Sequence, residues 1–167
     1  MSSQHKNLSS YHPETLPSAE PYRFVIVVSE WNQEITGALL EGAYQTLIQN
    51  KAQENNIIVR WVPGSFELPA AAALAIDTLL PDAVICLGCV IQGETRHFEF
   101  ICSAVADGIT QLSADTLIPV IFGVLTTDNM EQARARSGGV HGNKGIEAAV
   151  AAIKMAYLRN DFISLSE

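Results

Sequence analysis

The sequence predicts one α/β domain with a three-layer α/β/α architecture built on a four-stranded parallel sheet. Two observations carry this prediction. Four apolar runs are continuous rather than alternating, which is typical of parallel strands that are buried on both faces. Stretches with apolar residues at helical spacing separate these runs, and such alternation favours a parallel sheet with helices on both sides. The predicted strands are residues 24–29, 57–63, 83–90 and 119–126.

The first three connections each predict a helix. Between the first two strands, apolar residues recur at helical spacing from Ile35 to Ile48. Residues 69–80, in the second connection, are rich in alanine and leucine, which are good helix formers. Residues 97–113 fill the third connection. This order of elements corresponds to a flavodoxin-like sandwich, in which ligands bind beyond the carboxyl ends of the strands.

The segment after the fourth strand predicts two further helices. Asp128 followed by Glu131 predicts a capping box that opens a short helix over residues 128–136. A glycine-rich turn with the sequence SGGVHGNKG comes next. Residues 146–158 are rich in alanine and predict a last helix that packs closely on its neighbours.

The composition favours a protein that acts on small molecules. The 167 residues carry a formal net charge of −8, which argues against a nucleic-acid partner because phosphate backbones are bound by clustered lysine and arginine. The longest apolar runs fall short of the roughly 20 residues of a membrane span, so no membrane association is expected. The polar residues 1–22 predict a flexible N-terminal tail, and residues 23–167 form the single predicted domain. Three cysteines in apolar surroundings fit a reducing compartment, so we expect a cytoplasmic protein.

Cys86 and Cys89 form a C-x-x-C pattern inside the third predicted strand. Side chains three residues apart in a strand point to opposite faces of the sheet. We therefore interpret both as core thiols rather than as a redox or metal-binding pair. No spacing of histidine, cysteine and aspartate matches a zinc site, so no metal is predicted.

Aromatic and polar side chains follow the first two strands, at one rim of the predicted sheet. Aromatic rings beside amide, hydroxyl and carboxylate groups suit a site that stacks a planar ring and hydrogen-bonds its polar edge. In chain order these residues are Trp31, Asn32, Ser65, Phe66 and Glu67.

The loop after the third strand predicts an anion site with a proton-transfer group. Gly93, Glu94 and Thr95 precede a helix that begins near His97, so backbone N–H groups and the threonine hydroxyl could hold an anion at a helix N-terminus. An ordinary strand-to-helix turn is the competing interpretation. His97 is the histidine at this rim, and imidazole moves protons at neutral pH; a capping or buried histidine is the alternative.

Cationic side chains flank the late glycine-rich turn. Arg134, Arg136 and Lys144 together would suit a phosphate ester, although a solvated charged surface is the alternative interpretation. The string GGVHGNKG differs from a phosphate-binding P-loop, because its spacing is wrong and it lies between helices rather than after a strand. We therefore exclude nucleoside triphosphate hydrolysis.

Five blocks of sequence resemble the lumazine synthase family of riboflavin biosynthesis. The blocks are VPGSFELP, GCVIQGETRHFEF, PVIFGVLTT, EQARARSGG and GNKGIEAAVAAIKM, and the resemblance runs from about Phe24 to Leu158. It implies condensation of 5-amino-6-(D-ribitylamino)uracil with 3,4-dihydroxy-2-butanone 4-phosphate to 6,7-dimethyl-8-ribityllumazine, with release of phosphate and water. It also implies that no metal or organic cofactor takes part.

The resemblance also implies roles for residues that match the family's motifs. The pyrimidine and its ribityl chain would be held by Trp31, Asn32, Ser65, Phe66, Glu67, Val90 and Ile91 of one subunit, with Phe122 and Lys144 of the adjacent subunit. The phosphate would be bound by Gly93, Glu94 and Thr95, with Arg136 of the adjacent subunit. His97 would transfer protons.

Members of the family assemble as pentamers, in some cases packed into icosahedral shells. The resemblance therefore implies a homo-oligomer whose active sites are shared between subunits, and it suggests riboflavin synthase as a partner protein. The rival interpretation is a flavin-binding or scaffold paralogue with weak catalysis, because the fold and the aromatic rim also suit a flavin. A phospho-receiver domain is excluded because Glu30 stands alone after the first strand, without an acidic cluster.

Overall fold

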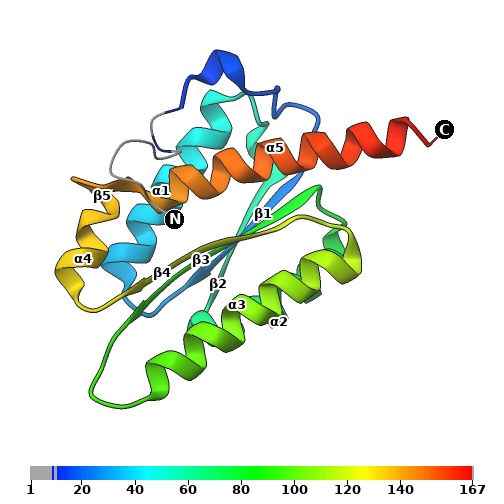
Figure 1. Cartoon of the computed structure of the whole chain (residues 1–167). Coiled ribbons are helices and arrows are strands. Elements are labelled where there is room, and N and C mark those ends of the chain that lie inside the picture. Colours follow the sequence, from blue (N-terminus) through cyan, green and yellow to red (C-terminus); the bar gives the residue numbers. More distant parts are fainter. Residues whose placement is uncertain (1–8, 10, 167) are drawn as a thin grey trace.

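The computed structural model describes residue 9 and residues 11–166, and it has the predicted three-layer architecture. Four parallel strands form the central sheet in the order β2-β1-β3-β4. Helices α1 and α5 cover one face, and α2 and α3 cover the other (Figure 1). The strands are β1 (Phe24–Ser29), β2 (Ile57–Val62), β3 (Ala83–Ile91) and β4 (Val120–Thr127). The helices are α1 (Gln33–Gln49), α2 (Leu68–Leu79), α3 (His97–Thr116), α4 (Met130–Ala135) and α5 (Lys144–Ser164).

The predicted strands and helices are confirmed with shifts of a few residues at their ends. Three short 3-10 helices were not predicted: η1 (Pro13–Thr15), η2 (Glu54–Asn56) and η3 (Ser65–Glu67). The glycine-rich turn also contains a small antiparallel ribbon, β5 (Ser137–Gly139) and β6 (Gly142–Asn143). In the part of the chain that is described, every helix is too short or too polar to cross a bilayer.

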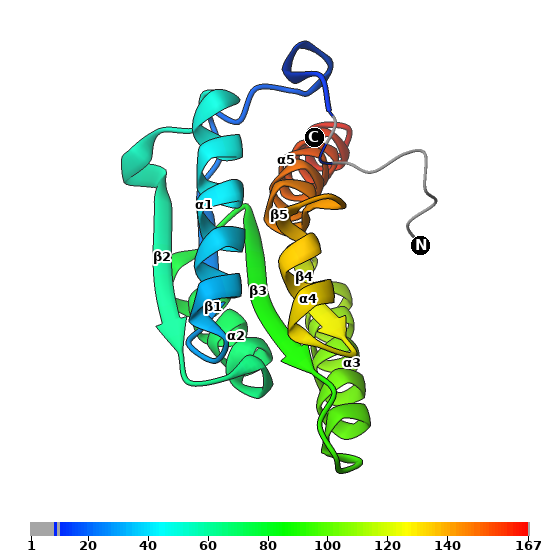
Figure 2. The ribbon, with the colours of Figure 1, turned by 90° about the vertical axis from the view of Figure 1, so that its left-hand side faces the viewer.

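The prediction that all four strands are buried on both faces is wrong for β2. This strand lies at the edge of the sheet (Figure 2), and Trp61 on it is more than one-third exposed. The helix layers cover the faces of an edge strand less completely than those of an inner strand. On β4, at the other edge, Thr126 is exposed as well. By contrast, β1 is buried along its whole length because it pairs with both β2 and β3.

The predicted capping box at Asp128 is also wrong, by one residue. Asn129 is the N-cap of α4, and its side-chain oxygen accepts a hydrogen bond of 2.9 Å from the N–H of Gln132. The Asp128 carboxylate instead accepts from the side-chain amide of Gln132 at 3.1 Å. Asparagine and aspartate are equally good N-caps, so residue type could not separate the two positions.

Part of the segment expected to be a flexible tail packs on the domain. Ala19 is fully buried, and Tyr22 is buried with its ring edge-on to Phe24. The Ala19 N–H donates to the carbonyl of Asn50 at 2.9 Å, and the Asn50 side chain donates to the Tyr11 hydroxyl at 3.1 Å. The packed region therefore begins before residue 23. The prediction for residues 1–8 and 10 lies outside the described residues.

Helices α1 and α5 approach each other closely where α5 begins. The Asn143 side chain caps α5 by accepting from the Gly145 N–H at 2.8 Å, and it donates to the Ala38 carbonyl of α1 at 2.9 Å. Gly145 itself faces the Leu39 backbone so closely that a Cβ there would overlap the Leu39 carbonyl. The start of α5 is therefore fixed directly against α1.

Cys86 and Cys89 lie on opposite faces of β3, as the strand periodicity predicts. Cys86 packs in the core cluster under α2 and α3, and Cys89 packs in the cluster under α1 and α5. Burial raises the pKa of the Cys86 thiol to about 12 and that of Cys89 to about 11. Both groups are therefore neutral thiols near pH 7, the form that is a poor nucleophile and a poor metal ligand.

We expect Cys86 and Cys89 to resist alkylation in the native protein. At pH 8, a thiol pKa near 12 instead of 9 lowers the thiolate fraction about a thousandfold, and burial also blocks the reagent. Half-buried Cys102 should react first. Iodoacetamide labelling read by mass spectrometry, with urea-unfolded protein as control, measures this. Equal labelling of Cys86 in native and unfolded protein would contradict the assignment.

Candidate functional site

The loops that follow β1, β2 and β3 lie at one rim of the sheet, because parallel strands end on the same side. Trp31 is 72% exposed and Phe66 is 57% exposed, so both rings are available to a ligand. Glu67 and Trp31 converge over Gly64: a Cβ at Gly64 would lie 3.1 Å from the Glu67 carboxylate and 3.3 Å from the indole. The structure therefore brings an aromatic ring and a carboxylate together at the rim.

Asn32 and Ser65 take positions that the sequence could not show. Asn32 is in the left-handed conformation (φ 58°), and its side-chain N–H donates to the Cys89 carbonyl of β3 at 3.0 Å. Its amide thus ties the loop after β1 to β3. Ser65 is buried, and its hydroxyl lacks a hydrogen-bond partner among the described residues. That hydroxyl lies against Gly88, where a Cβ would be 2.6 Å away, so it points toward β3.

The predicted anion loop is open and exposed. A Cβ on Gly93 would meet no other atom of the described chain within 4 Å, and Glu94, Thr95 and His97 are all exposed. Helix α3 begins at His97, whose N–H donates to the Thr95 hydroxyl at 3.4 Å. This bond is long and easily exchanged for a bond to an anion. The loop is therefore accessible at the N-terminus of a 20-residue helix.

Val90 and Ile91 end β3, but the structure does not bring their side chains to one face. Val90 packs beside the cluster under α2 and α3, whereas Ile91 packs beside the cluster under α1 and α5. Phe122 lies in the middle of β4, paired in register with Cys86, and is half-buried. These three residues therefore do not form a common pocket within one chain.

Arg136 and Lys144 meet at a carboxylate that sequence reasoning missed. Glu147 lies 3.7 Å from an Arg136 guanidinium nitrogen and 3.1 Å from the Lys144 ammonium. Its side chain is only 11% exposed, while the two cations are 25% and 29% exposed. The i, i+3 spacing of Lys144 and Glu147 was the available sequence signal. We call Arg136, Lys144 and Glu147 the cation cluster.

Arg136 also lines a cavity of about 630 Å³ at the carboxyl end of β4. Thr127 lines the same cavity, and its carbonyl accepts a hydrogen bond of 2.8 Å from the Gln92 N–H. The loop that leads to Gly93 and the Arg136 cavity therefore both adjoin the end of β4. Arg134, in contrast, points to α1 and forms two hydrogen bonds with Glu34, of 2.7 Å and 3.0 Å. These bonds lower the pKa of the Glu34 carboxyl.

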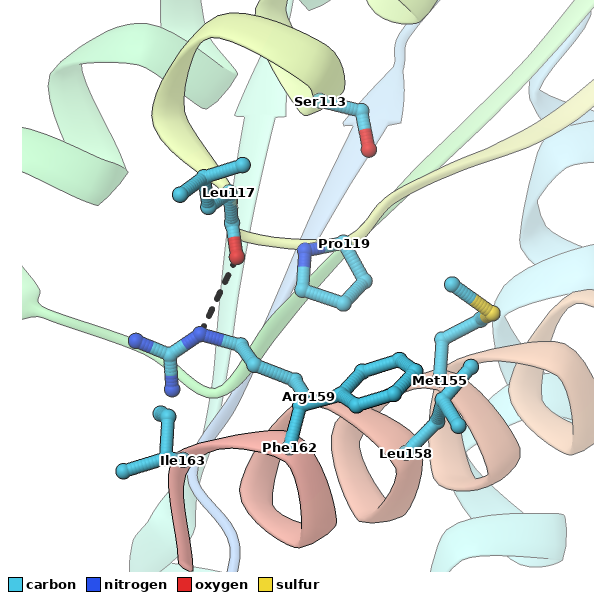
Figure 3. Close-up of a pocket in the computed structure, with 8 residues that line it drawn as sticks. All are labelled: Ser113, Leu117, Pro119, Met155, Leu158, Arg159, Phe162 and Ile163. Atoms are coloured by element: carbon cyan, nitrogen blue, oxygen red, sulfur yellow. Dashed lines mark hydrogen bonds between the residues drawn. The ribbon is translucent and has the colours of Figure 1, made fainter. Parts of the chain in front are cut away.

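A second hollow, of about 400 Å³, lies between α5 and the segment that joins α3 to β4. Figure 3 shows Phe162, Met155 and Leu158 of α5 facing Leu117 and Pro119, with Arg159 donating to the Leu117 carbonyl at 3.0 Å. None of the predicted site residues lines it. Across residue 9 and residues 11–166, no cluster of three potential metal-binding side chains occurs.

The rim loops, β4 and the cation cluster all fall inside one region that known proteins share. The family model for 6,7-dimethyl-8-ribityllumazine synthase matches residues 21–160. The chain belongs to this family. Proteins named 6,7-dimethyl-8-ribityllumazine synthase are 57% identical in Flavobacterium johnsoniae, over 95% of this chain and 84% of the relative, and 57% identical in Cytophaga hutchinsonii, over 93% and 97%. The relative in Porphyromonas gingivalis is 51% identical over 95% of this chain and 98% of its own length.

Family membership covers the predicted site in full, since every residue from Trp31 to Lys144 lies within the matched range. The match to the lumazine synthase family does not assign a role to each residue, so the roles are argued from where the side chains lie. One chain presents the rim with its anion loop and, at the end of β4, the cation cluster with its cavity.

Proposed function

We propose that this protein is a 6,7-dimethyl-8-ribityllumazine synthase. It condenses 5-amino-6-(D-ribitylamino)uracil with 3,4-dihydroxy-2-butanone 4-phosphate and releases phosphate and water. The observation that carries the proposal is the match of the family model to residues 21–160, which includes every loop of the rim. The reaction joins an amine to a ketone and expels phosphate, so it needs orientation, proton transfer and anion binding. It proceeds without a metal or organic cofactor.

Trp31 supplies an exposed ring against which the pyrimidine stacks, and the exposed Phe66 contacts the ribityl chain and its neighbouring groups. Glu67, which lies beside Trp31 over Gly64, accepts hydrogen bonds from the ring edge or the ribityl chain. The remaining members of this binding set are Asn32, Ser65, Val90 and Ile91 of the same subunit, with Phe122 and Lys144 of the adjacent subunit.

Gly93, Glu94 and Thr95 bind the phosphate through backbone N–H groups and the threonine hydroxyl. The open space over Gly93 and the helix that starts at His97 support this assignment. Arg136 of the adjacent subunit contributes a guanidinium, which suits a phosphate dianion. His97, next to this loop, transfers protons as the amine adds to the ketone and phosphate leaves.

The sites are shared between subunits of a cytoplasmic homo-oligomer, either a pentamer or an icosahedral shell of pentamers, with riboflavin synthase as a partner that consumes the product. Shared sites are supported by Val90, Ile91 and Phe122, which do not form a common pocket within one chain. Large apolar side chains that are more than half exposed support further packing between chains. Examples are Leu74, Leu80, Phe100 and Leu117. Sedimentation of the 18.1 kDa chain distinguishes pentamer from shell.

The function is tested by mixing pure protein with both substrates in a buffer without phosphate. Lumazine formation is followed by absorbance and fluorescence against the uncatalysed rate. The proposal expects clear acceleration. A protein that gives no acceleration but binds riboflavin tightly would instead be a flavin-binding paralogue.

His97→Ala is expected to lower kcat only moderately. A general acid or base typically raises the reaction rate about 100-fold or more. Because these substrates also react without a catalyst, we expect a smaller loss of kcat. The measurement is kcat at saturating substrates, with His12→Ala as the matched control because His12 is exposed and pairs only with Glu14 at 3.7 Å among the described contacts. An unchanged kcat in His97→Ala would remove the residue from proton transfer.

A further inference from the structure

Ser9 contacts the cation cluster from the N-terminal segment. Its hydroxyl accepts a hydrogen bond of 3.1 Å from the Asn143 N–H. The hydroxyl has two acceptors within hydrogen-bond distance, the Asn143 carbonyl at 3.1 Å and the Glu147 carboxylate at 3.3 Å. Ser9 therefore ties the N-terminal segment to the N-cap and first turn of α5, which lie more than 130 residues later in the sequence.

The contact to Glu147 is specific to one carboxylate oxygen. Ser9 and Arg136 both approach Oε1 of Glu147, whereas Lys144 approaches Oε2. The Arg136 guanidinium is 3.7 Å away, beyond hydrogen-bond distance, so its attraction to Oε1 is electrostatic and depends on where that oxygen lies. Two like charges are held near each other only while the carboxylate stays between them.

We propose that Ser9 is a positioning residue for the phosphate-binding Arg136: its hydroxyl fixes Glu147, and Glu147 in turn holds Arg136 ready for the anion. The inference rests on the proposed function, in which Arg136 binds phosphate. Ser9 lies outside the residues 21–160 that match the family model, so this contact is an addition to the matched domain. A preorganised guanidinium binds a dianion more tightly than one that must first be ordered.

The test compares Ser9→Ala and Ser9→Thr with wild type. The control is Ser18→Ala, an exposed serine of the same segment whose hydroxyl accepts only from the Glu20 N–H at 3.3 Å among the described contacts. KM for each substrate, kcat and the dissociation constant of inorganic phosphate are measured. Phosphate binding, read by calorimetry, does not depend on turnover.

Ser9→Ala is expected to raise both KM for the phosphate-bearing substrate and the dissociation constant of phosphate about three- to tenfold, the range for one lost hydrogen bond of ordinary strength. KM for the pyrimidine and kcat should stay within about twofold, because the rim is untouched and Lys144 keeps its own contact with Oε2 of Glu147. Ser9→Thr keeps the hydroxyl and should restore phosphate binding. Ser18→Ala should match wild type.

Wild-type phosphate binding in Ser9→Ala would overturn the inference. So would equal weakening of both substrates together with a lower unfolding midpoint, since that pattern reports a structural role only. Arg136→Ala in the same experiment distinguishes a failure of the Ser9 inference from a failure of the proposed phosphate role of Arg136. If Arg136→Ala weakens phosphate binding and Ser9→Ala does not, the inference alone fails; if Arg136→Ala has no effect, the proposed phosphate role fails and the inference fails with it.

Discussion

Gly145→Ala is expected to lower the stability of the protein severely, to the point of insoluble expression or a much lower unfolding midpoint. An alanine Cβ at this position would overlap the carbonyl of Leu39 and lie 2.9 Å from the Leu39 Cα. Both obstacles are backbone atoms inside α1, so no side-chain rotation relieves the clash. Overpacking costs about 1–3 kcal/mol where the core can adjust, and more where it cannot, against a total stability of roughly 5–15 kcal/mol.

Gly37→Ala is the matched control for this substitution. Gly37 lies within α1, and a Cβ there would meet nothing within 4 Å in the described part of the protein. Alanine is favoured over glycine in a helix interior by about 0.8–1 kcal/mol, so this variant should be as stable as wild type or more so. Thermal and urea unfolding followed by circular dichroism measure both variants. Similar midpoints for the two variants would show that α5 does not depend on close approach to α1.

The sequence predicted the sheet well because the strands of a doubly covered parallel sheet must be apolar along their length. Residues 24–29 meet this condition, and β1 has the same bounds in the structure. The same argument failed for β2, because an edge strand can carry Arg60 and Trp61 at solvent-exposed positions. The ribbon of β5 and β6 could not be predicted either. Its residues are glycine-rich and show no strand periodicity. The ribbon is held in place by a tertiary hydrogen bond, from the Asn143 side chain to the Ala38 carbonyl of α1.

Predictions for the site divide in the same way. The position of Trp31, Gly93 and His97 at one rim follows from strand direction, so the sequence was sufficient. The cation cluster was only half visible. Its cations follow from their charge, and the i, i+3 spacing of Lys144 and Glu147 was a local signal for their pair. The contact of Glu147 with Arg136 needs the turn between them to fold, and the contact with Ser9 needs the N-terminal segment to reach α5. Side chains joined across more than 100 residues leave no local pattern to read.

Arg136→Ala is expected to raise KM for 3,4-dihydroxy-2-butanone 4-phosphate roughly 10- to 100-fold, with a much smaller change in kcat. Hydrogen bonds to charged groups contribute about 1.5–3 kcal/mol, and each 1.4 kcal/mol is about tenfold in affinity. The guanidinium is three-quarters buried beside a cavity, and Glu147 attracts it at 3.7 Å without a hydrogen bond, so its N–H groups can turn to an anion at little cost. This KM is measured by initial-rate kinetics with 5-amino-6-(D-ribitylamino)uracil at a saturating concentration.

Arg134→Ala supplies the control, because it removes the same charge two residues earlier in the chain. Arg134 forms an exposed ion pair with Glu34, which joins α4 to α1. If the phosphate substrate responded only to the net charge of this surface, the two variants would raise KM equally and a salt titration would erase both effects. If Arg136 acts locally, Arg134→Ala should leave KM for the phosphate substrate within about twofold of wild type. Arg136→Lys should bind this substrate better than Arg136→Ala but less well than wild type, since lysine keeps the charge without the bidentate donors.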